Sequence, residues 1–409
     1  MNFDDLKLSD QILRSLKDQK YDKPTPIQAE VIPAILNNSD VMAAAQTGTG
    51  KTAAFVLPIL NKLSDPKNDY KGHQLRALII TPTRELAAQV NENVNTYSKY
   101  LGIRSTAVYG GARIHNQQLK LRKGVDVLVA TPGRLLDLYN QKSVNFKNIE
   151  ILVLDEADQM LDMGFIHDIK KIIGLLPERR QNLMFTATFS NSFRSLAKEL
   201  SKHAIEISVT SDGETGANIE HYVHPVDKSR KAELLIELIE TEGWSQALVF
   251  TRTKHGADRL QKQLDKVGIK AQAIHGNKTQ NNRMKALEAF KNNKIKILVA
   301  TDVAARGIDI KKMSQVINFD VPTVAKDYIH RIGRTGRGGD EGKAITLVSS
   351  DEFRLLKDIE KLLNQTLPRY EVAGFEPIEV VPSGEKKKKK NFNSKAGFNH
   401  RTRSKNRKG

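Results

Sequence analysis

Short apolar segments rich in β-branched residues alternate with longer segments whose apolar residues recur every three to four positions. The first pattern predicts buried strands and the second predicts amphipathic helices. Alternation of this kind is typical of α/β folds with parallel sheets. The expected strands are residues 41–45, 77–81, 106–109, 125–130, 151–154, 183–186 and 205–209, followed by 222–226, 247–251, 271–275, 297–300, 316–319 and 344–348. The expected helices include residues 86–100, 168–176, 231–240, 257–267, 282–291 and 351–363.

The alternation occurs twice along the 409 residues, and residues 210–218 (TSDGETGAN) separate the two sets. The Ser, Thr, Asp and Gly content of this segment predicts a flexible linker. We therefore expect an α/β protein of two tandem parallel-sheet domains, residues 1–209 and 219–370. An extension, residues 371–409, would follow the second domain.

The positive charge is concentrated at the end of the chain. Residues 383–409 hold eleven basic residues and one acidic residue, so of the net +18 they carry +10 and residues 1–382 carry +8. A strongly basic chain favours polyanionic partners such as nucleic acid or an anionic membrane surface. Only Phe392 and Phe398 are large apolar groups here, too few to offset the entropy of ordering. This segment is predicted to be a disordered tail that either anchors a nucleic acid or only improves solubility.

Several classes of protein are excluded by what the chain lacks. It has no cysteine, which rules out disulfides, thiol catalysis and Cys-ligated zinc, and none of its ten histidines forms an HExxH motif. The first ten residues are mixed and acidic, and no run of about 18 apolar residues occurs. We expect a monomeric cytoplasmic protein with no membrane span.

A phosphate-binding loop is indicated at residues 45–52, which read AQTGTGKT between an expected strand and a helical run. The strict pattern has Gly at the first position, where this chain has Ala45. Gly48 and Gly50 would let backbone amides turn toward phosphate oxygens, and the helix N-terminus would add positive potential. Lys51 would reach the β- and γ-phosphates, and Thr52 would bind Mg²⁺. The expected ATP contacts in this loop are Ala45, Gln46, Thr47, Gly48, Thr49, Gly50, Lys51 and Thr52.

Carboxylates follow the very apolar segment 151–154, in the sequence Asp155-Glu156-Ala157-Asp158. In open α/β sheets, ligands bind at the carboxyl ends of the strands. Asp155 could therefore hold Mg²⁺, and Glu156 could accept a proton from an attacking water. Taken alone, an acidic strand end is more often a solvated cap, but the phosphate-binding loop upstream favours the catalytic interpretation.

Seven more strings occur along the chain: PTPIQ (24–28), PTREL (82–86), GG (110–111), TPGR (131–134), TAT (186–188), ATDVAARGID (300–309) and HRIGRTGR (330–337). With these strings in this order, residues 1–370 resemble the DEAD-box ATP-dependent RNA helicases. The strings LDMGFIHDIK and VFTRTKHGA are most similar to the bacterial RhlE-type branch of that family.

The resemblance implies two RecA-like domains, the first of which opens with an adenine-recognition segment at residues 1–29. Gln28 would pair with the adenine edge, since an amide both donates and accepts. Tyr21 would pack on the base, and Phe3 would support the segment. Lys20 stands where relatives usually have Gly.

The resemblance also implies roles for residues of both domains. Asp309 would contact the ribose, and Arg334 and Arg337 would neutralise charge at the γ-phosphate from the second domain. Coupling between the ATP and RNA sites is assigned to Asp158, Thr186, Thr188 and His330, with Thr186 in a place where relatives commonly have Ser. RNA contacts, to phosphate and 2′-OH groups, are expected at Pro82, Thr83, Arg84, Gly111, Thr131, Gly133, Arg134, Arg252, Gly276, Gln280, Arg283, Thr301 and Asp302.

The function implied is RNA-stimulated ATP hydrolysis, with ATP and Mg²⁺ as cofactors, coupled to local, non-processive unwinding of short RNA duplexes. Ribosome assembly and RNA turnover, with precursor-ribosome or RNA-decay proteins as partners, are the roles that bacterial relatives suggest. An ATP-gated RNA clamp or annealing chaperone is an alternative that would use the same residues. A DNA helicase is disfavoured by the resemblance.

Overall fold

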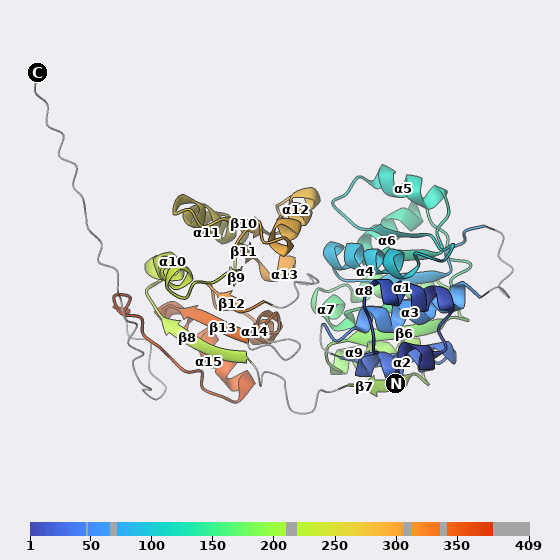
Figure 1. Ribbon diagram of the computed structural model, residues 1–409, viewed down its shortest axis with the longest axis horizontal. Coiled ribbons are helices and arrows are strands. Elements are labelled where there is room, and N and C mark those ends of the chain that lie inside the picture. The colour runs from blue at the N-terminus through green and yellow to red at the C-terminus, as the bar shows by residue number, and fades with distance from the viewer. Residues whose placement is uncertain (46–47, 66–71, 210–218, 306–312, 336–341, 379–409) are drawn as a thin grey trace, which may run out of the picture.

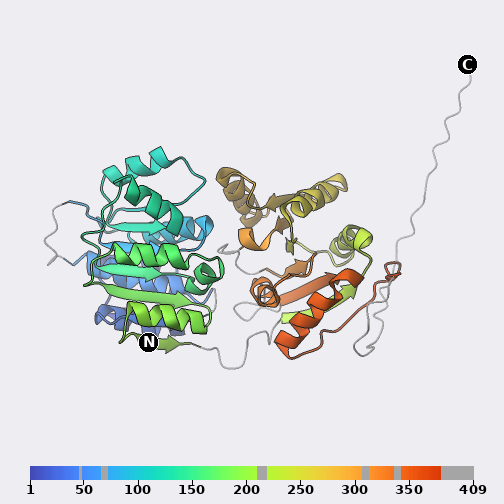
Figure 2. The ribbon, with the colours of Figure 1, turned by 180° about the vertical axis from the view of Figure 1, so that it is seen from behind.

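The structure is a computed structural model that describes residues 1–45, 48–65, 72–209, 219–305, 313–335 and 342–378. Two parallel sheets, each covered by helices, form two lobes that lie side by side (Figures 1 and 2). Lobe 1 is residues 1–209 and lobe 2 is residues 219–378. The expected linker at residues 210–218 and the expected tail at 383–409 lie outside the described residues.

Lobe 1 is built around a seven-stranded sheet in the order β3-β4-β2-β5-β6-β1-β7, and all its pairings are parallel. Its strands are β1 (Val41–Ala44), β2 (Ala77–Ile80), β3 (Ser105–Val108), β4 (Val127–Ala130), β5 (Ile151–Leu154), β6 (Gln181–Thr186) and β7 (Ile205–Ser208). Its helices are η1 (Phe3–Leu6), α1 (Asp10–Asp18), α2 (Pro26–Leu36), α3 (Lys51–Leu63), α4 (Arg84–Tyr97), α5 (Ile114–Arg122), α6 (Pro132–Asn140), α7 (Ala157–Asp162), α8 (Ile166–Gly174) and α9 (Asn191–Leu200).

Lobe 2 repeats the plan with six parallel strands in the order β10-β11-β9-β12-β13-β8. Its strands are β8 (Ile219–Pro225), β9 (Ala247–Phe250), β10 (Ala271–Ile274), β11 (Ile297–Ala300), β12 (Gln315–Asn318) and β13 (Gly342–Val348). Its helices are η2 (Lys228–Arg230), α10 (Lys231–Thr241), α11 (Lys254–Lys266), α12 (Gln280–Lys291), α13 (Asp302–Ala305), α14 (Ala325–Ile332), η3 (Ser350–Glu352) and α15 (Phe353–Leu363).

Every strand predicted from the apolar pattern is confirmed, with shifted ends. The strand β6 begins two residues earlier than predicted, at Gln181 and Asn182, which are polar but buried. Their side chains are satisfied by distant partners, because Gln181 Nε2 donates to the Ser39 carbonyl at 2.6 Å and Asn182 Nδ2 donates to Asp40 Oδ2 at 3.2 Å. A hydrophobicity pattern does not predict the burial of such polar residues, because their hydrogen-bond partners are known only from the folded structure.

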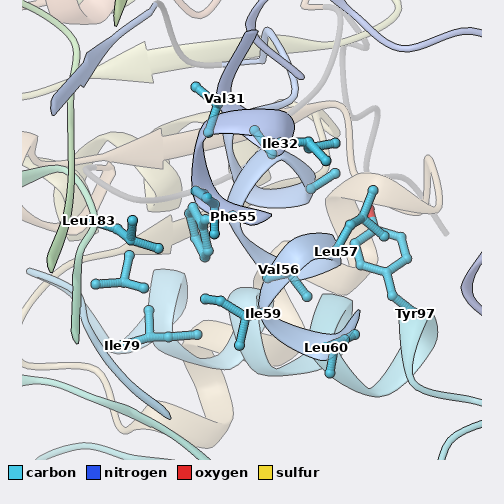
Figure 3. Packing of buried hydrophobic residues seen from close by; sticks show 14 of the residues in the cluster. Val31, Ile32, Phe55, Val56, Leu57, Ile59, Leu60, Ile79, Tyr97 and Leu183 are labelled. Carbon is cyan, nitrogen blue, oxygen red and sulfur yellow. The ribbon is translucent and has the colours of Figure 1, made fainter. Parts of the chain in front are cut away.

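The helix α3, which follows the expected phosphate loop, is buried around most of its circumference. Figure 3 shows its side chains, among them Phe55 and Ile59, packed between α2, α4 and the sheet. Burial of each such side chain contributes about 1.5–3 kcal/mol. The apolar sequence TAAFVLPIL therefore fixes the helix, and the position of Lys51 at its first turn is fixed with it.

The chain after α15 returns along the outer edge of the lobe 2 sheet. The Val223 amide of β8 donates to the Pro368 carbonyl at 2.9 Å, and the Tyr370 amide donates to the Val223 carbonyl at 2.9 Å. The Tyr370 ring packs edge-on against Tyr222 at 5.3 Å between centroids. Pairing with this segment satisfies the edge of β8, which would otherwise offer unpaired backbone groups to another chain.

None of the helices in the described ranges combines the length and apolarity needed to cross a bilayer.

Candidate nucleotide and RNA site

The loop between β1 and α3 has the backbone shape that phosphate binding requires. Gly48 and Gly50 have φ of 92° and 95°, in the left-handed region that favours glycine. Lys51 is the first residue of α3 and is only 6% exposed, with its Nζ 3.4 Å from the Thr186 carbonyl oxygen. Thr52 follows on the same turn. This geometry presents amides and one cation at a helix N-terminus. Gln46 and Thr47 lie outside the described residues.

Gln28 links the start of α2 to this loop. Its Oε1 accepts from the Thr25 amide at 3.0 Å in a capping box, and its Nε2 donates to the Gly50 carbonyl at 3.1 Å. A Cβ added to Gly50 would lie 2.4 Å from Gln28 Nε2. Each half of the amide can still make one further hydrogen bond. The adenine contact stays a prediction, and the structure adds a second role for Gln28 as a clamp on the loop.

Lys20, expected to stand where relatives have Gly, lies in the turn before α2. Lys20 has φ of 57°, a left-handed conformation that strains residues with a Cβ. The next residue, Tyr21, is 39% exposed, and its ring centroid lies 6.4 Å from that of Tyr97. Phe3 is buried, 5% exposed, as its supporting role requires.

Asp155 and Glu156 lie directly after β5, at the carboxyl edge of the sheet. Asp155 is buried and its Oδ1 accepts from the Glu156 amide at 3.0 Å. Burial, followed by the charge of Glu156, raises the pKa of Asp155 to about 7. Glu156 has φ of 51°, so the catalytic candidate itself is in the left-handed region. Strain of this kind clusters at functional sites.

The residues present fit Mg²⁺. Thr52 and Asp155 offer hard oxygen ligands, and a nearby cation would favour the ionised form of the buried carboxyl. Among the residues described, no group of three or more His, Cys, Asp or Glu side chains could enclose a metal. Mg²⁺ usually needs only one or two carboxylates beside water and substrate phosphates.

The predicted coupling residues of lobe 1 are brought together. Asp158 Oδ2 accepts from the Ala187 amide at 3.1 Å, which joins the carboxylate loop to the segment 186–188. Thr186 donates from Oγ1 to the Thr188 carbonyl at 2.9 Å. Because the Thr186 carbonyl also lies beside Lys51 Nζ, one chain of contacts runs from the phosphate loop through residues 186–188 to Asp158.

The RNA candidates of lobe 1 lie at the starts of α4 and α6. Arg84 lies against Gly111, where an added Cβ would be 2.0 Å from Arg84 Nη1. Arg134 Nη1 donates to the Ala112 carbonyl at 3.2 Å. Thr83 caps α4 by accepting from the Leu86 amide at 3.3 Å. Pro82 is buried, Thr131 is the N-cap of α6, and Gly133 is exposed in its first turn.

Two RNA candidates of lobe 2 contact lobe 1 instead of solvent. Gln280 Nε2 donates to Glu85 Oε1 at 2.8 Å, and Arg283 Nη2 lies 2.9 Å from Glu85 Oε2. All three side chains are buried. Sequence reasoning did not select Glu85, although it stands inside the PTREL string beside Arg84. The bridge joins α4 to α12 across the two lobes.

Two further RNA candidates are held by buried groups of lobe 2. Arg252 Nη2 donates to Glu352 Oε1 at 2.6 Å and to the Val321 carbonyl at 3.1 Å. Asp302 accepts from Arg331 at 2.6 Å and 2.7 Å in a two-pronged pair. Arg331, 1% exposed, was not selected from the sequence, although it belongs to the HRIGRTGR string. Thr301 is half-buried and Gly276 is exposed.

His330 and Arg334 line a small hollow beside the Arg331–Asp302 pair, with Phe250, Ala305 and Asp327. Its volume of about 10 Å³ is too small for a ligand. Asp309 and Arg337, the other candidates of this lobe for the nucleotide, lie outside the described residues.

Comparison with known proteins identifies the family. A model of the DEAD/DEAH box helicase domain matches residues 25–196, and a model of the helicase conserved C-terminal domain matches residues 230–339. The DEAD-box ATP-dependent RNA helicase RhpA of Helicobacter pylori is 40% identical over 380 residues, which cover 93% of this chain and 76% of RhpA. This chain belongs to the DEAD-box ATP-dependent RNA helicases. As such it is an enzyme that hydrolyses ATP, and the prediction of the family is confirmed. CshA of Bacillus cereus is 42% identical over 367 residues, or 90% of this helicase and 69% of CshA.

Solved structures confirm the two RecA-like domains. Dbp5 of S. cerevisiae bound to RNA and ADP BeF3 is 32% identical, with a TM-score of 0.78 over 90% of this helicase and 95% of that chain. A Dbp5 complex with nup159, gle1, ip6 and ADP, 31% identical over 90% of this helicase and 96% of that chain, gives 0.61. Both comparisons include both lobes.

Proposed function

We propose that this helicase couples RNA-stimulated ATP hydrolysis to local, non-processive separation of short RNA duplexes. The supporting observation is the bridge from Glu85 to Gln280 and Arg283, which joins the lobes beside Arg84. On α4, Glu85 contacts the partner lobe and directly follows Arg84, which is predicted to contact RNA. On α12, Gln280 and Arg283 are both contacts to lobe 1 and predicted RNA contacts. A strand held by both lobes would favour the same closed arrangement.

On the nucleotide side, the loop amides and Lys51 hold the phosphates, and Gln28 fixes the loop through Gly50. Glu156 accepts the proton of the attacking water, and Arg334 and Arg337 neutralise charge from lobe 2. Mg²⁺, bound through Thr52 and Asp155, would supply charge neutralisation at the phosphates.

On the RNA side, each ligand that spans both lobes strengthens binding of the other, because both favour closure. The contact between Asp158 and the Ala187 amide connects the carboxylate segment 155–158 directly to residues 186–188. Closure on one strand of a duplex would bend that strand and expel its partner. Hydrolysis would then release the lobes and the strand.

We also propose the branch of the family, the cellular location and the partners of this helicase. The charge of residues 383–409 supplies a sequence-independent RNA anchor. The strings LDMGFIHDIK and VFTRTKHGA support a place in the RhlE-type branch. We infer a cytoplasmic monomer that acts on bacterial RNA in ribosome assembly or RNA turnover, with precursor-ribosome or RNA-decay proteins as candidate partners.

Steady-state ATP hydrolysis tests the proposal. The full chain is assayed without nucleic acid, with single-stranded RNA and with DNA of equal sequence, and Lys51→Ala serves as the control for contaminating activity. Strong stimulation by RNA alone, absent in Lys51→Ala, supports RNA coupling. Equal hydrolysis under all three conditions would remove the coupling from the proposal.

The net +10 of residues 383–409 favours a second candidate, an ATP-gated RNA clamp or annealing chaperone. Removing these residues should weaken RNA affinity and flatten its salt dependence while ATP hydrolysis persists. Strand separation and annealing of a short duplex are then measured with and without the tail. Annealing that exceeds unwinding in the full chain, and is lost with the tail, would favour the clamp. An unchanged salt dependence would reduce the tail to a spacer.

A further inference from the structure

A second concentration of positive charge lies within lobe 2. Residues 254–296, here called the basic segment, run from the start of α11 to the residue before β11. They hold eleven Lys and Arg residues against three Asp and Glu residues, a net +8. Because residues 1–382 together carry +8, the rest of the folded part sums to zero. Nine of the eleven basic residues are exposed, so the charge faces solvent.

The basic segment encloses a hollow between α11, β10 and α12, the elements that lie together at one end of the lobe 2 sheet (Figure 1). Its volume is about 270 Å³, and five of its six lining residues are polar or charged. Apolar and aromatic side chains, which dominate small-molecule pockets, do not form its walls. This cavity is here called the basic hollow. It is lined by Gln261, Gln272, Ala273, Lys278, Asn282 and Lys285.

The backbone of this edge is already satisfied, which argues against a protein strand as the occupant. β10 is an edge strand, but its Ala271 amide donates to Asp265 Oδ1 at 3.2 Å and its Ala273 amide donates to Gln261 Oε1 at 3.2 Å. A β-strand partner would need those donors. What the hollow offers is side-chain amides and ammonium groups, which suit phosphate and hydroxyl oxygens.

The hollow is continuous with the predicted RNA track. Lys278 follows Gly276 by two residues, and Asn282 and Lys285 alternate on α12 with Gln280 and Arg283. One face of α12 therefore contacts lobe 1, while Asn282 and Lys285 line the hollow. Lys278 lies 2.8 Å from Asp258 Oδ1, which holds its Nζ at the rim.

We propose that the basic hollow binds the sugar-phosphate backbone of RNA segments that extend beyond the track between the lobes. It makes phosphate contacts without reading bases, and it raises affinity for long RNA over short RNA. The inference rests on the proposed function, because it needs an RNA already engaged between the lobes. It differs from the role of the tail, because its position on the fold is fixed.

The test compares full-length variants on single-stranded RNAs of about 8 and about 40 nucleotides, lengths chosen to lie within and beyond a single binding site. Lys278→Gln/Lys285→Gln should weaken binding of the long RNA roughly tenfold and lower the slope of log affinity against log salt by about 1.4. Binding of the short RNA and its stimulation of ATP hydrolysis should not change. Lys285→Gln alone, which leaves Asp258 paired, should lower the slope by about 0.7.

Lys171→Gln/Lys361→Gln is the matched control, since it removes the same charge from exposed sites on α8 and α15. The control should bind both RNAs like the wild type. Equal losses in the two double variants would show an effect of net charge alone and overturn the proposal. Loss of short-RNA binding in the hollow variant would also overturn it, because the hollow would then belong to the main track.

Photo-crosslinking with 4-thiouridine adds a measurement of position. Crosslinks at Gln261, Gln272 and Lys285, which line the hollow and are not predicted contacts of the track, should form with the long RNA and not with the short one. Labelling by neither would overturn the proposal. If wild-type ATP hydrolysis is not stimulated by RNA at all, the proposed function fails. If stimulation is normal and both RNAs bind the hollow variant like the wild type, only the present inference fails.

Discussion

The two lobes share a fold but hold their functional residues in place in different ways. In lobe 1 the backbone conformation positions them, with Gly48, Gly50 and Glu156 all at positive φ. In lobe 2 the side chains are held by buried charge. Lys231 donates to Glu352 and to the carbonyls of Phe319 and Leu347 at 2.9 Å and 2.8 Å, and Glu352 also accepts from Arg252.

The contrast extends to how exposed the ion pairs are. Pairs within lobe 1 such as Arg76–Glu150 and Lys99–Asp18 each have at least one partner more than a third exposed. Lobe 2 also has exposed pairs such as Lys228–Asp351, but it contains in addition the pair of Lys231 and Glu352, whose side chains are 2% and 4% exposed. Burial lowers the pKa of Lys231, so its charge depends on Glu352. Lobe 1 should therefore tolerate loss of a charge better than lobe 2, and lobe 2 should tolerate backbone changes better.

The largest expected effect is a loss of catalysis in lobe 1 without a loss of binding. Glu156→Gln should lower RNA-stimulated kcat by about 10²- to 10⁴-fold, the usual contribution of a general base, while ATP and RNA binding persist. Single-turnover hydrolysis and equilibrium binding measure the two separately. Unchanged turnover would remove Glu156 as the base.

Glu352→Gln should destabilise lobe 2 by about 3 kcal/mol, because it leaves Lys231 and Arg252 without a buried counter-charge. Trp244, the only tryptophan of the chain and buried in lobe 2, reports this unfolding by fluorescence in urea. The matched control is Asp351→Asn, which breaks an exposed pair with Lys228 and should cost less than about 1 kcal/mol. Equal losses would contradict the assigned role of buried charge.

A backbone change in lobe 1 should act on RNA binding. Gly111→Ala puts a methyl group where Arg84 lies and strains a residue with φ of 77°, so RNA affinity should fall by roughly tenfold. Gly174→Ala, where a Cβ meets nothing within 4 Å, is the control and should leave binding unchanged. Fluorescence anisotropy with labelled RNA measures both. Wild-type affinity in Gly111→Ala would show that the contact with Arg84 does not matter for RNA.

The smallest expected effect is a gain in the stability of lobe 1. Lys20→Gly should stabilise lobe 1 by about 0.5–1 kcal/mol, because relief of the left-handed Lys exceeds the entropy cost of Gly. Lys17→Gly, an exposed position inside α1, should instead cost about 1 kcal/mol. Calorimetry of both variants compares them. Destabilisation by Lys20→Gly would mean that its side chain has an interaction that outweighs the strain.

The sequence by itself determined the strands, the two-domain division of the chain and the family. These are local properties. An apolar run of four to six residues predicts a strand, and a string such as GTGKT indicates the family, without knowledge of distant contacts. The left-handed φ of Lys20 is a local feature too, but the structure was needed to show it.

Only the tertiary structure decided which distant charges meet. Glu85 faces Gln280 and Arg283 across 195 or more positions, and Lys231 meets Glu352 across 121. The return of residues 368–370 along β8, and the enclosure of the basic hollow by α11, β10 and α12, depend on the same kind of contact. Residue type and spacing do not encode these pairings, because a charged side chain is stable in the core only where the completed fold supplies its partner.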